Sequence, residues 1–359
     1  MLRFLFKRIT YGILVMAGVV TVVFFMFNVL PGDPARMMGG NRMDSVTIAN
    51  IQRDLGLDRP LPVQFAMYVN DLSPISLHDT VDRDHFLYLN SNRYQSYTRL
   101  LGIGDSKMLI MKAPYLRRSY QTKRRVSEIL SESLPETAIL ATTSMTFAAI
   151  VGIILGIFAA IRKDTWFDNS SLVLAVLGMS APSFFSGIII AWLFGYELSE
   201  YTGLNMTGSL YTLDPFEGEI LTLQNLILPA FTLGIRPLAI IVQLTRSSML
   251  DVLSQDYIRT AKSKGLSYYK VIFKHALKNA LNPVITTMSG WFASLLAGAV
   301  FIEYVFGWKG IGLELFQALE KYDLPVAMGV TLFLAGVFVV VNIVVDIIYA
   351  VLDPRVRLS

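Results

Sequence analysis

Histidines and aspartates cluster in one segment of this chain, where their side chains could ligate a metal ion. The cluster consists of His78, Asp79, Asp82, Asp84 and His85. The seven-residue spacing of the two histidines in a polar loop matches no standard ligand pattern, and acidic polar loops are common on outer surfaces. The sequence therefore predicts no metal site here, and the third histidine, which lies in a basic helical stretch at position 275, is expected to pack or to form hydrogen bonds.

The familiar motifs of catalysis are missing from the sequence. No Gly-x-x-x-x-Gly-Lys-Ser/Thr loop is present to hold the phosphates of ATP, and no His-Glu-x-x-His pair is present to hold catalytic zinc. The chain has no cysteine, so it has neither a thiol nucleophile nor a disulfide. We expect a protein that is not an enzyme and that holds no cofactor of its own.

Arg236 stands out as the one charged residue inside the apolar run Leu226–Leu244. Roughly 15 Å of helix would separate it from either membrane surface. An unpaired arginine there costs about 2.5–3.5 kcal/mol on insertion scales, and Pro237 beside it should widen the helix. Arg236 should therefore face a polar pathway or pair with an acid of another subunit, unless the boundary of the run is misplaced. Glu303 and Asp346 are expected near opposite membrane faces.

A polar, basic stretch from Asp256 to Pro283 lies between two apolar runs and has the pattern of two short helices. The helices meet at Gly265, which can adopt the left-handed conformation that ends a helix, and Ser267 is a preferred residue for starting the next. Lysines recur every four residues from Lys270 to Lys278 and form one basic stripe. Such an elbow on a membrane surface could receive force from another protein, although a basic loop held at anionic headgroups remains the simpler alternative.

The elements around these residues are predicted to be membrane helices. Hydrophobic residues make up 53% of the chain and charged residues 16%, against roughly 25% charged in soluble domains. Runs of about 20 apolar residues predict six spans. These are Tyr11–Leu30, Thr137–Ile161, Ser171–Phe194, Leu226–Leu244, Val284–Ile302 and Pro325–Val345. The first run is too long for a cleavable signal peptide and is interpreted as a retained helix.

The distribution of Lys and Arg predicts the orientation of the spans. With a cytosolic N-terminus, the inside segments hold 14 basic residues and the two short outside loops, 195–225 and 303–324, hold two. Both termini and the elbow at 246–283 are therefore expected in the cytosol. The net charge of +4 follows from this topology, so nucleic-acid binding is not needed to explain it.

Two helices carry patterns that could serve movement. Small residues recur every four positions from Ala148 to Ala160 in the second span, which lets helix backbones approach closely, either within the chain or between subunits. In the third span, Pro182 should kink the helix among Ser180, Ser183 and Ser186. A kinked, hydroxyl-lined helix suits a water-filled pathway.

The elbow resembles the cytosolic loop of ABC-importer membrane subunits, whose general form is Glu-Ala-Ala, three residues, Gly, nine residues, Ile-x-Leu-Pro. Arg259, Thr260 and Ala261 stand at the Glu-Ala-Ala position and Gly265 at the glycine. The first Glu, the Ile and the Pro of the general motif are absent, and the variant found here is similar to that of the B-type subunit of the dipeptide/oligopeptide/nickel permeases. Three more segments carry the same resemblance: Leu30-Pro31-Gly32-Asp33-Pro34, Leu55-Gly56-Leu57-Asp58-Arg59-Pro60-Leu61, and Asn342 to Arg355.

The resemblance implies an all-α polytopic membrane protein with six transmembrane helices, the type I permease fold of ABC importers. Residues 1–30 would form the cytosolic N-terminus and first helix, and 31–133 a large external (periplasmic) loop. Residues 134–359 would form a five-helix core. Residues 74–114 are interpreted as a folded insertion in the external loop, with strands near Phe86–Asn90 and Lys107–Met111 and a break at Gly102–Gly104.

The resemblance also implies a function and partners. The chain would be a multi-pass subunit of the bacterial inner membrane that forms half of a translocation path for peptides. Its partners would be a homologous C-type permease subunit, two cytosolic ABC ATPases that bind the ATP, and an external solute-binding protein. The residues implied to contact an ATPase are Arg259, Thr260, Ala261, Gly265, Leu266 and Ser267.

The substrate remains open between dipeptides, longer peptides, nickel complexes and other small solutes. A secondary transporter or channel that works alone is the alternative from another class. It would need acidic or ion-coupling residues near the membrane midplane, where Arg236 is the clear charge. An ABC exporter half is disfavoured because no ATPase domain is fused to the chain.

Overall fold

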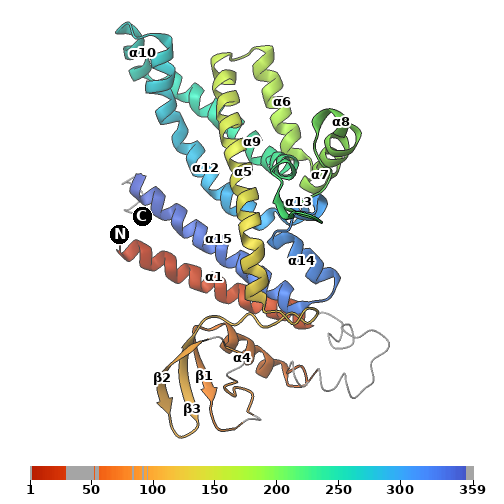
Figure 1. Cartoon of the computed structure of the whole chain (residues 1–359). Helices are drawn as coiled ribbons and strands as arrows, with labels where there is room; N and C mark the ends of the chain where they lie inside the picture. The colour runs from red at the N-terminus through yellow and green to blue at the C-terminus, as the bar shows by residue number, and fades with distance from the viewer. Residues whose placement is uncertain are drawn as a thin grey trace. The chain divides into compact units, whose positions relative to one another are not determined.

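The computed structural model of the 359-residue chain describes residues 2–29, 52, 56–82, 85–90, 93–94 and 96–352 (Figure 1). The motifs predicted around Pro31 and Pro354 lie outside these residues. The chain divides into two compact units, and each is described by itself. Unit 1 comprises Met1–Gly12, Leu134–Leu313 and Val337–Ser359, and unit 2 comprises Ile13–Ser133 and Glu314–Gly336.

Helices dominate the described residues, and two short segments are π-helical. The long helices are α1 (Leu2–Val29), α5 (Val126–Ile161), α9 (Gln224–Leu253), α12 (Leu277–Gly298) and α15 (Leu324–Leu352). The shorter ones are α4 (Leu61–Leu72), α6 (Trp166–Ser180), α7 (Ser183–Trp192), α8 (Ser199–Thr202), α10 (Asp256–Ser263), α11 (Tyr268–Lys270), α13 (Val300–Phe306) and α14 (Ile311–Glu320). The π-helical segments are η2 (Leu193–Glu197) and η3 (Val271–Ala276).

Four helices are long and apolar enough to cross a membrane by themselves within the described residues. They include Phe6–Phe27, Val126–Ile161, Gln224–Leu253 and Leu324–Ile347. Two further pairs of helices meet this criterion of length and apolar character only when each pair is taken together. One pair, α6 with Ser183–Glu197, is bent by 106°, and the other, Tyr268–Leu296 with α13, is bent by 56°. The described part of the chain thus holds four to six candidate spans.

The stretches Ser171–Phe194 and Val284–Ile302, each predicted as one span, are both interrupted. The first breaks between Ser180 and Ser183. Pro182 lacks an N–H group and disfavours the helical conformation of the residue before it, so Ala181 is extended, with φ −73° and ψ 134°. Pro182 is also extended, with φ −58° and ψ 134°. Two consecutive extended residues turn the chain much further than the kink that the sequence predicts.

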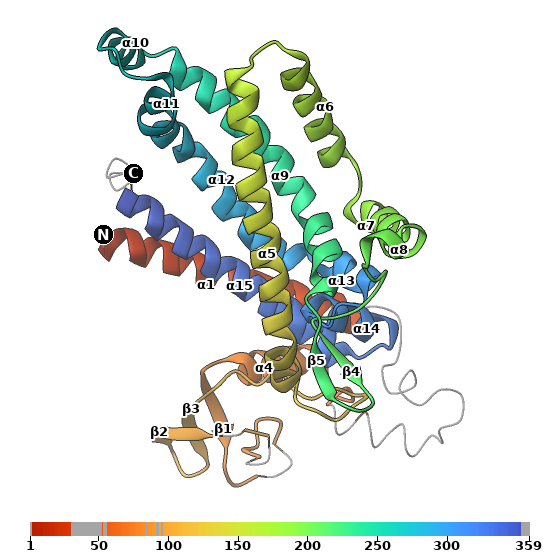
Figure 2. The same cartoon turned by 45° about the horizontal axis from the view of Figure 1, so that its top comes forward.

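Helix α9 is the centre of unit 1. In its apolar 18-residue stretch, 61% is buried inside the chain. The helix packs against α6, α7, α12 and α13 (Figure 2). Buried side chains of α5, such as Leu140 and Met145, join those of α9, such as Leu233 and Ile241, in one hydrophobic core. Most of α9 is therefore enclosed by other helices of unit 1, while the Arg236 side chain stays exposed in the isolated chain.

The small residues of α5 pack against α9 within the same chain. A Cβ atom on Gly152 would lie 2.8 Å from Cγ2 of Ile241, and one on Gly156 would lie 2.6 Å from Cβ of Thr245 and 2.9 Å from the Val242 carbonyl. No carbon fits at such distances, so the absence of side chains lets the two helices touch. Of the two roles that the sequence allows for this stripe, the structure shows packing within the chain.

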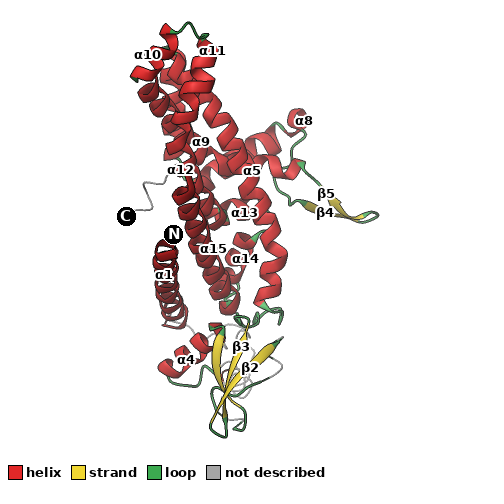
Figure 3. Cartoon of the chain, turned by 90° about the vertical axis from the view of Figure 1, so that its left-hand side faces the viewer, coloured by secondary structure: helices red, strands yellow, loops and turns green. Residues whose placement is uncertain are grey.

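Unit 2 contains a three-stranded antiparallel sheet, so the fold is not all-α as predicted. The strands are β1 (Ile75–Asp79), β2 (Tyr97–Ile103) and β3 (Lys107–Lys112), in the order β1-β3-β2 (Figure 1), and Figure 3 shows the strands in yellow among the red helices. The predicted strand at Lys107–Met111 is confirmed, and Gly104 forms the turn before it with φ +67°. The predicted break at Gly102 is wrong, because Gly102 pairs with Met108 inside the sheet.

The predicted strand at Phe86–Asn90 is also wrong. This segment folds back along β1 with a single isolated bridge, between Asp79 and Tyr88. The Leu87 carbonyl lies 3.2 Å from Nδ1 of the buried His78, and the Leu89 N–H donates to the Asp79 carbonyl at 2.8 Å. The Leu87 carbonyl also accepts the Asp79 N–H at 3.0 Å, so the segment pairs with β1 at this one bridge and does not extend into a strand.

A buried lysine links the sheet to α4. Nζ of Lys112 donates to the carbonyls of Asn70, Asp71 and Ser73 at 3.1, 2.6 and 3.2 Å, so its ammonium group satisfies the C-terminal end of the helix. Burial lowers the pKa of Lys112. The segment predicted as an external insertion is therefore folded, and the buried Lys112 ties its sheet to α4.

A second, unpredicted β element lies in the loop 195–225. Strands β4 (Tyr211–Asp214) and β5 (Gly218–Leu221) pair as an antiparallel hairpin (Figure 2). At its tip, Oδ1 of Asp214 accepts the N–H groups of Phe216 and Glu217 at 2.7 and 3.0 Å.

Replacing Gly156 by leucine should destabilise the protein by about 1–3 kcal/mol or more, because the side chain would overlap Thr245. The measurement is the thermal unfolding of the purified full chain in detergent. Gly18→Leu is the matched control, because nothing lies within 4 Å of a Cβ atom at Gly18. Equal melting temperatures for the two variants would show that the close contact between α5 and α9 is not needed.

Candidate functional site

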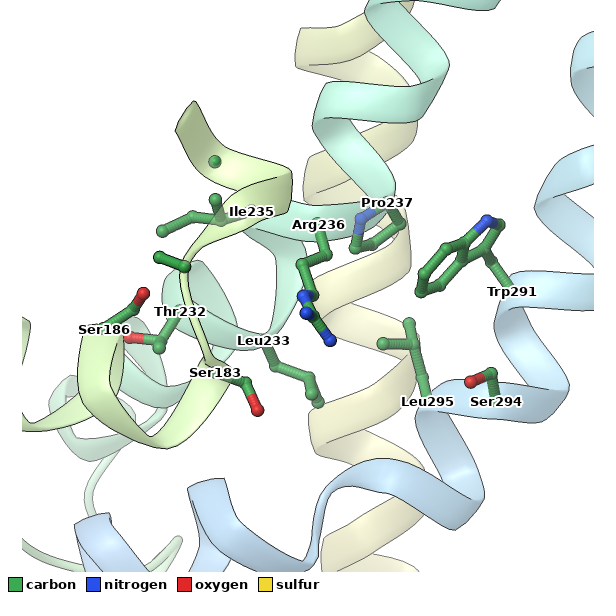
Figure 4. Close-up of a pocket in the computed structure, with 12 residues that line it drawn as sticks. Ser183, Ser186, Thr232, Leu233, Ile235, Arg236, Pro237, Trp291, Ser294 and Leu295 are labelled. Carbon is green, nitrogen blue, oxygen red and sulfur yellow. The ribbon is translucent and has the colours of Figure 1, made fainter. Parts of the chain in front are cut away.

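A cavity of about 90 Å³ in unit 1 surrounds the side chain of Arg236. Its wall comes from the α6–α7 break and from α7, α9 and α12, and Ser183, Ser186, Thr232 and Ser294 supply hydroxyl groups (Figure 4). In Figure 4 the guanidinium group extends from α9 into the space between Ser183 and Leu295. The predicted hydroxyl lining of this region is thus found for two of the three serines, since Ser180 instead donates to the Val176 carbonyl of its own helix.

The break at Ala181-Pro182 creates this cavity. If α6 continued straight, its next turn would carry Ser183 and Ser186 onward in the same direction. The 106° bend instead places α7 beside the middle of α9, where Thr232 and Arg236 lie. The hydroxyl groups that line the cavity thus come from three helices, α7, α9 and α12.

Arg236 lies well inside α9. It is 12 residues after Gln224 (236 − 224), or roughly 18 Å at 1.5 Å per residue. The continuous helix from 224 to 253 argues against a misplaced span boundary. Within the described part of the chain, Arg236 forms no ion pair, and its side chain is exposed in the isolated chain. The cavity thus presents a fixed positive charge that this chain does not neutralise.

The predicted elbow has the expected helix–glycine–helix form. Helix α10 ends at Ser263, Gly265 has φ +73°, and Ser267 occupies the N-cap position of α11 without a capping hydrogen bond from its side chain. The second helical run continues through η3 into α12, so its first turns are partly π-helical rather than uniformly α-helical. Lys270, Lys274 and Lys278 are all exposed.

The elbow is anchored to the bundle by a buried apolar cluster. Ile258 and Ala261 of α10 pack with residues of η3, α9 and α5, such as Ile272, Met249 and Ile157. Nδ2 of Asn279 also donates to the hydroxyl of Tyr257 at 2.8 Å. The elbow therefore moves with the helices that carry it.

The six elbow residues predicted to contact an ATPase differ in their exposure. Arg259, Thr260, Gly265 and Ser267 are exposed, and Leu266 is half-buried. Ala261 is buried against the bundle, 7% exposed, so it is part of the anchor.

An ion pair that the sequence did not reveal joins α9 to the first turn of α6. Arg246 is bidentate to Asp168: its Nε contacts Oδ1 and its Nη2 lies 2.6 Å from Oδ2. Asp168 is fully buried and also accepts the N–H of Asp164 at 2.9 Å. The two partners lie 78 positions apart, and without a structure they read as independent charges near a membrane surface.

A second buried acid, Glu303, also escaped sequence analysis. Its Oε1 accepts the hydroxyl of Thr137 at 2.7 Å, and its Oε2 accepts the N–H groups of Gly312 and Leu313 at 2.6 and 3.1 Å. The N–H of Ile311 donates to Oγ1 of Thr137 at 2.8 Å. Gly310 and Gly312 leave no room for a Cβ atom beside this carboxylate, and these close glycines are the signal that could have suggested it.

The histidine cluster is used for hydrogen bonds. His78, 2% exposed, lies 3.0 Å from Oγ of Ser76, and burial lowers its pKa. Oδ1 of Asp79 accepts the N–H groups of Val81 and Asp82 at 2.9 and 2.8 Å. No group of three potential metal ligands occurs among the described residues, and Asp84 lies outside them.

A helical membrane protein with a surface elbow is typical of the membrane components of transport systems, and comparison with known proteins agrees. The family model described as binding-protein-dependent transport system inner membrane component matches residues 152–358. The model for the N-terminal part of such membrane components matches residues 1–85. The chain belongs to this family of binding-protein-dependent transport system inner membrane components.

Curated relatives match along the whole chain. A protein of Brucella abortus (strain 2308), described as a candidate peptide transport system permease, is 36% identical over 357 residues, 99% of each chain. The dipeptide transport system permease protein of Alkalihalophilus pseudofirmus is 33% identical, covering 99% of this chain and 100% of the relative. The glutathione transport system permease protein of Salmonella paratyphi A is 34% identical, covering 99% of each. Among solved structures, an amino acid ABC transporter matches 64% of this chain with 14% identity and a TM-score of 0.43.

Replacing Arg236 by alanine should lower the rate of transport about tenfold or more, since a charge-assisted interaction contributes about 1.5–3 kcal/mol. Arg236→Lys should retain part of the rate because it keeps the charge. The measurement is solute uptake together with co-purification of partner subunits. Loss of co-purification in Arg236→Ala would instead indicate an ion pair with a partner, because a stranded buried acid typically costs about 3–5 kcal/mol. Intact assembly with normal transport would exclude both roles.

Proposed function

We propose that this chain is the transmembrane subunit of an ATP-driven ABC importer and forms half of a translocation path for peptides. The observation that carries the proposal is the anchored elbow at Gly265 in a chain whose family is that of binding-protein-dependent transport components. The names of the curated relatives support peptides as substrates. The glutathione permease among them leaves the exact peptide open, and nickel complexes or other small solutes remain the alternative.

In this proposal the chain crosses the bacterial inner membrane six times, with each bent helix pair counted as one span. Both termini and the elbow face the cytosol, in keeping with the 14-to-two distribution of basic residues. The sheet of unit 2 and the β4–β5 hairpin are then external. The site for peptides lies between this chain and a homologous C-type permease, and the Arg236 side chain supplies a positive charge to a peptide carboxylate.

The elbow transmits force from an ATPase in this proposal. Arg259, Thr260, Gly265, Leu266 and Ser267 form the contact surface, while Ala261 and Ile258 hold α10 to the bundle. Closure of the two cytosolic ATPases on ATP would push α10. Because α10 is packed on α9 and α5, the push tilts these helices and exposes the pathway to one side of the membrane at a time. An external solute-binding protein would deliver the substrate.

The proposed function predicts that Gly265→Asp abolishes uptake and leaves folding intact. A non-glycine residue in the left-handed conformation costs roughly 1–2 kcal/mol, and the added carboxylate would obstruct a close contact. The test is ATP-dependent uptake of a labelled dipeptide by proteoliposomes that contain the chain, its partner permease, both ATPases and the binding protein. Nothing lies within 4 Å of a Cβ atom at Gly265, so membrane abundance should be unchanged.

The control for this experiment is Gly203→Asp, another glycine in the left-handed conformation (φ +66°) with open space around a Cβ atom, which lies at the end of α8 rather than at the elbow. The wild-type complex should take up the dipeptide only with ATP. Full uptake by Gly265→Asp at normal abundance would contradict the role of the elbow, and uptake by the chain alone without ATPases would contradict the function as a whole.

The proposed orientation predicts which residues a membrane-impermeant thiol reagent reaches. Because the chain lacks cysteine, single cysteines can be introduced without background. Cysteines at the exposed Arg99 and Lys107 should react in intact spheroplasts. Cysteines at the exposed Lys262 and Lys264 should react only after the membrane is opened. Reaction of the elbow in intact spheroplasts would overturn the orientation and the proposed ATPase contact.

A further inference from the structure

A basic cavity of about 230 Å³ lies in unit 2, between α4 and the segment that connects β3 to α5. Four of its lining side chains are cationic: Arg93, Arg117, Arg118 and Lys123. Asp71 is the one acid among the lining residues, so the lining carries a net charge of +3 (four cations minus one anion).

Asp71 neutralises only Arg117 among these cations, because its two oxygens are taken by Arg117 and Tyr94. Oδ2 of Asp71 lies 3.4 Å from Nε of Arg117, and Oδ1 accepts the hydroxyl of Tyr94 at 3.1 Å. Within the described residues, Arg93, Arg118 and Lys123 form no ion pair. Like charges gathered at one site repel each other, and an anion between them would remove that repulsion.

The backbone holds these cations in an unusual and well-fixed conformation. Arg117 and Lys123 have φ angles of 65° and 60°, in the left-handed region that costs a non-glycine residue roughly 1–2 kcal/mol. Hydrogen bonds fix the loop between them: Asp323 accepts the hydroxyl of Ser119 and, at 2.9 Å, the N–H of Tyr120. Residues kept in such conformations by their surroundings are concentrated at ligand sites.

The cavity adjoins an apolar cleft at the ends of two membrane helices. Arg117 and Tyr120 line both, and the cleft is completed by Tyr68 of α4 and by side chains of α15 such as Leu324 and Met328. Tyr68 packs against Phe24 of α1, with ring centroids 5.6 Å apart. The buried hydroxyl of Tyr68 has no hydrogen-bond partner among the described residues, so it is a free donor beside the basic cavity.

We propose that this cavity binds a phosphate group, and that the group is the headgroup of an anionic phospholipid. Arginine forks bind phosphate oxygens in pairs, and several cations around one cavity suit a charged phosphate better than a single carboxylate. The cleft itself, at about 10 Å³, is too small for an acyl chain, but the exposed Phe25 and Met26 of α1 give acyl chains an apolar surface beside α4. A free phosphate ion has the same headgroup chemistry but would leave this apolar surface uncovered. This site lies beyond the proposed function and does not depend on it.

The test measures thermal unfolding of the full chain, purified with its partner subunits, as ligand is added. The three probes are phosphatidylglycerol, phosphatidylcholine and inorganic phosphate. Phosphatidylglycerol should raise the melting temperature of the wild-type chain, and phosphatidylcholine should not. In the double variant Arg118→Gln, Lys123→Gln the concentration for half of this effect should rise about 100-fold, because each lost charge-assisted hydrogen bond weakens binding about tenfold.

The matched control is the double variant Arg99→Gln, Lys107→Gln, which removes two exposed cations from the sheet of unit 2 but none from the cavity. It should respond as the wild-type chain does. A response to inorganic phosphate that equals the lipid response, with the same dependence on Arg118 and Lys123, would assign the site to free phosphate rather than lipid. Equal responses of both double variants, or no response to any probe, would overturn the proposal. None of these readouts uses transport, so they are separate from the test of the importer function.

Discussion

A backbone that crosses hydrocarbon must satisfy its own hydrogen bonds, and this constraint governs the structure. Where a membrane helix is interrupted, other hydrogen bonds pair the backbone groups that the interruption frees. The Ala181 N–H still donates to the Leu177 carbonyl, and the Ser186 N–H donates to the Pro182 carbonyl at 3.0 Å. The break between α6 and α7 is tolerated because it lies against α9 and lines a polar cavity rather than lipid.

The start of α14 follows the same rule with a side chain. The carboxylate of Glu303 in α13 accepts N–H groups of Gly312 and Leu313 in the first turn of α14. Four N–H groups at a helix start lack partners inside the helix, and a buried start is costly without substitutes. A buried acid and two adjacent glycines thus stabilise a chain reversal that an apolar run could not provide.

Apolar run length located the membrane helices from sequence because burial in lipid depends on composition alone. Gly265 was predictable for a similar reason: left-handed geometry after a helix is a local property of one residue type. The breaks were harder. Pro182 marked the right position, but the size of the bend depends on whether Ala181 also leaves the helix, which neighbouring packing decides.

Contacts between distant segments could not be predicted, since no local pattern encodes them. Arg246 and Asp168 each look like ordinary charges near a span end, and their pairing depends on how α6 packs against α9. The β4–β5 hairpin and the strand Ile75–Asp79 were missed because their few residues carry a weak alternation. The cavity around Arg236 is formed by four helices, α6, α7, α9 and α12, so the sequence could indicate only that the arginine requires a polar surrounding.

The pair Arg246–Asp168 connects the two parts of the candidate site. Arg246 lies ten residues before α10 (256 − 246), and Asp168 lies in the first turn of α6, whose other end is the break at Ala181. A bidentate pair with a fully buried carboxylate resists separation, because parting it would leave an unpaired charge away from water. A displacement of α10 is therefore carried to α6 as well as α9. The first point along α6 that can bend is its end at Ala181-Pro182, beside the Arg236 cavity. Under the proposed function, a push on the elbow would change the shape of the cavity by hinging α7 rather than by deforming a packed helix.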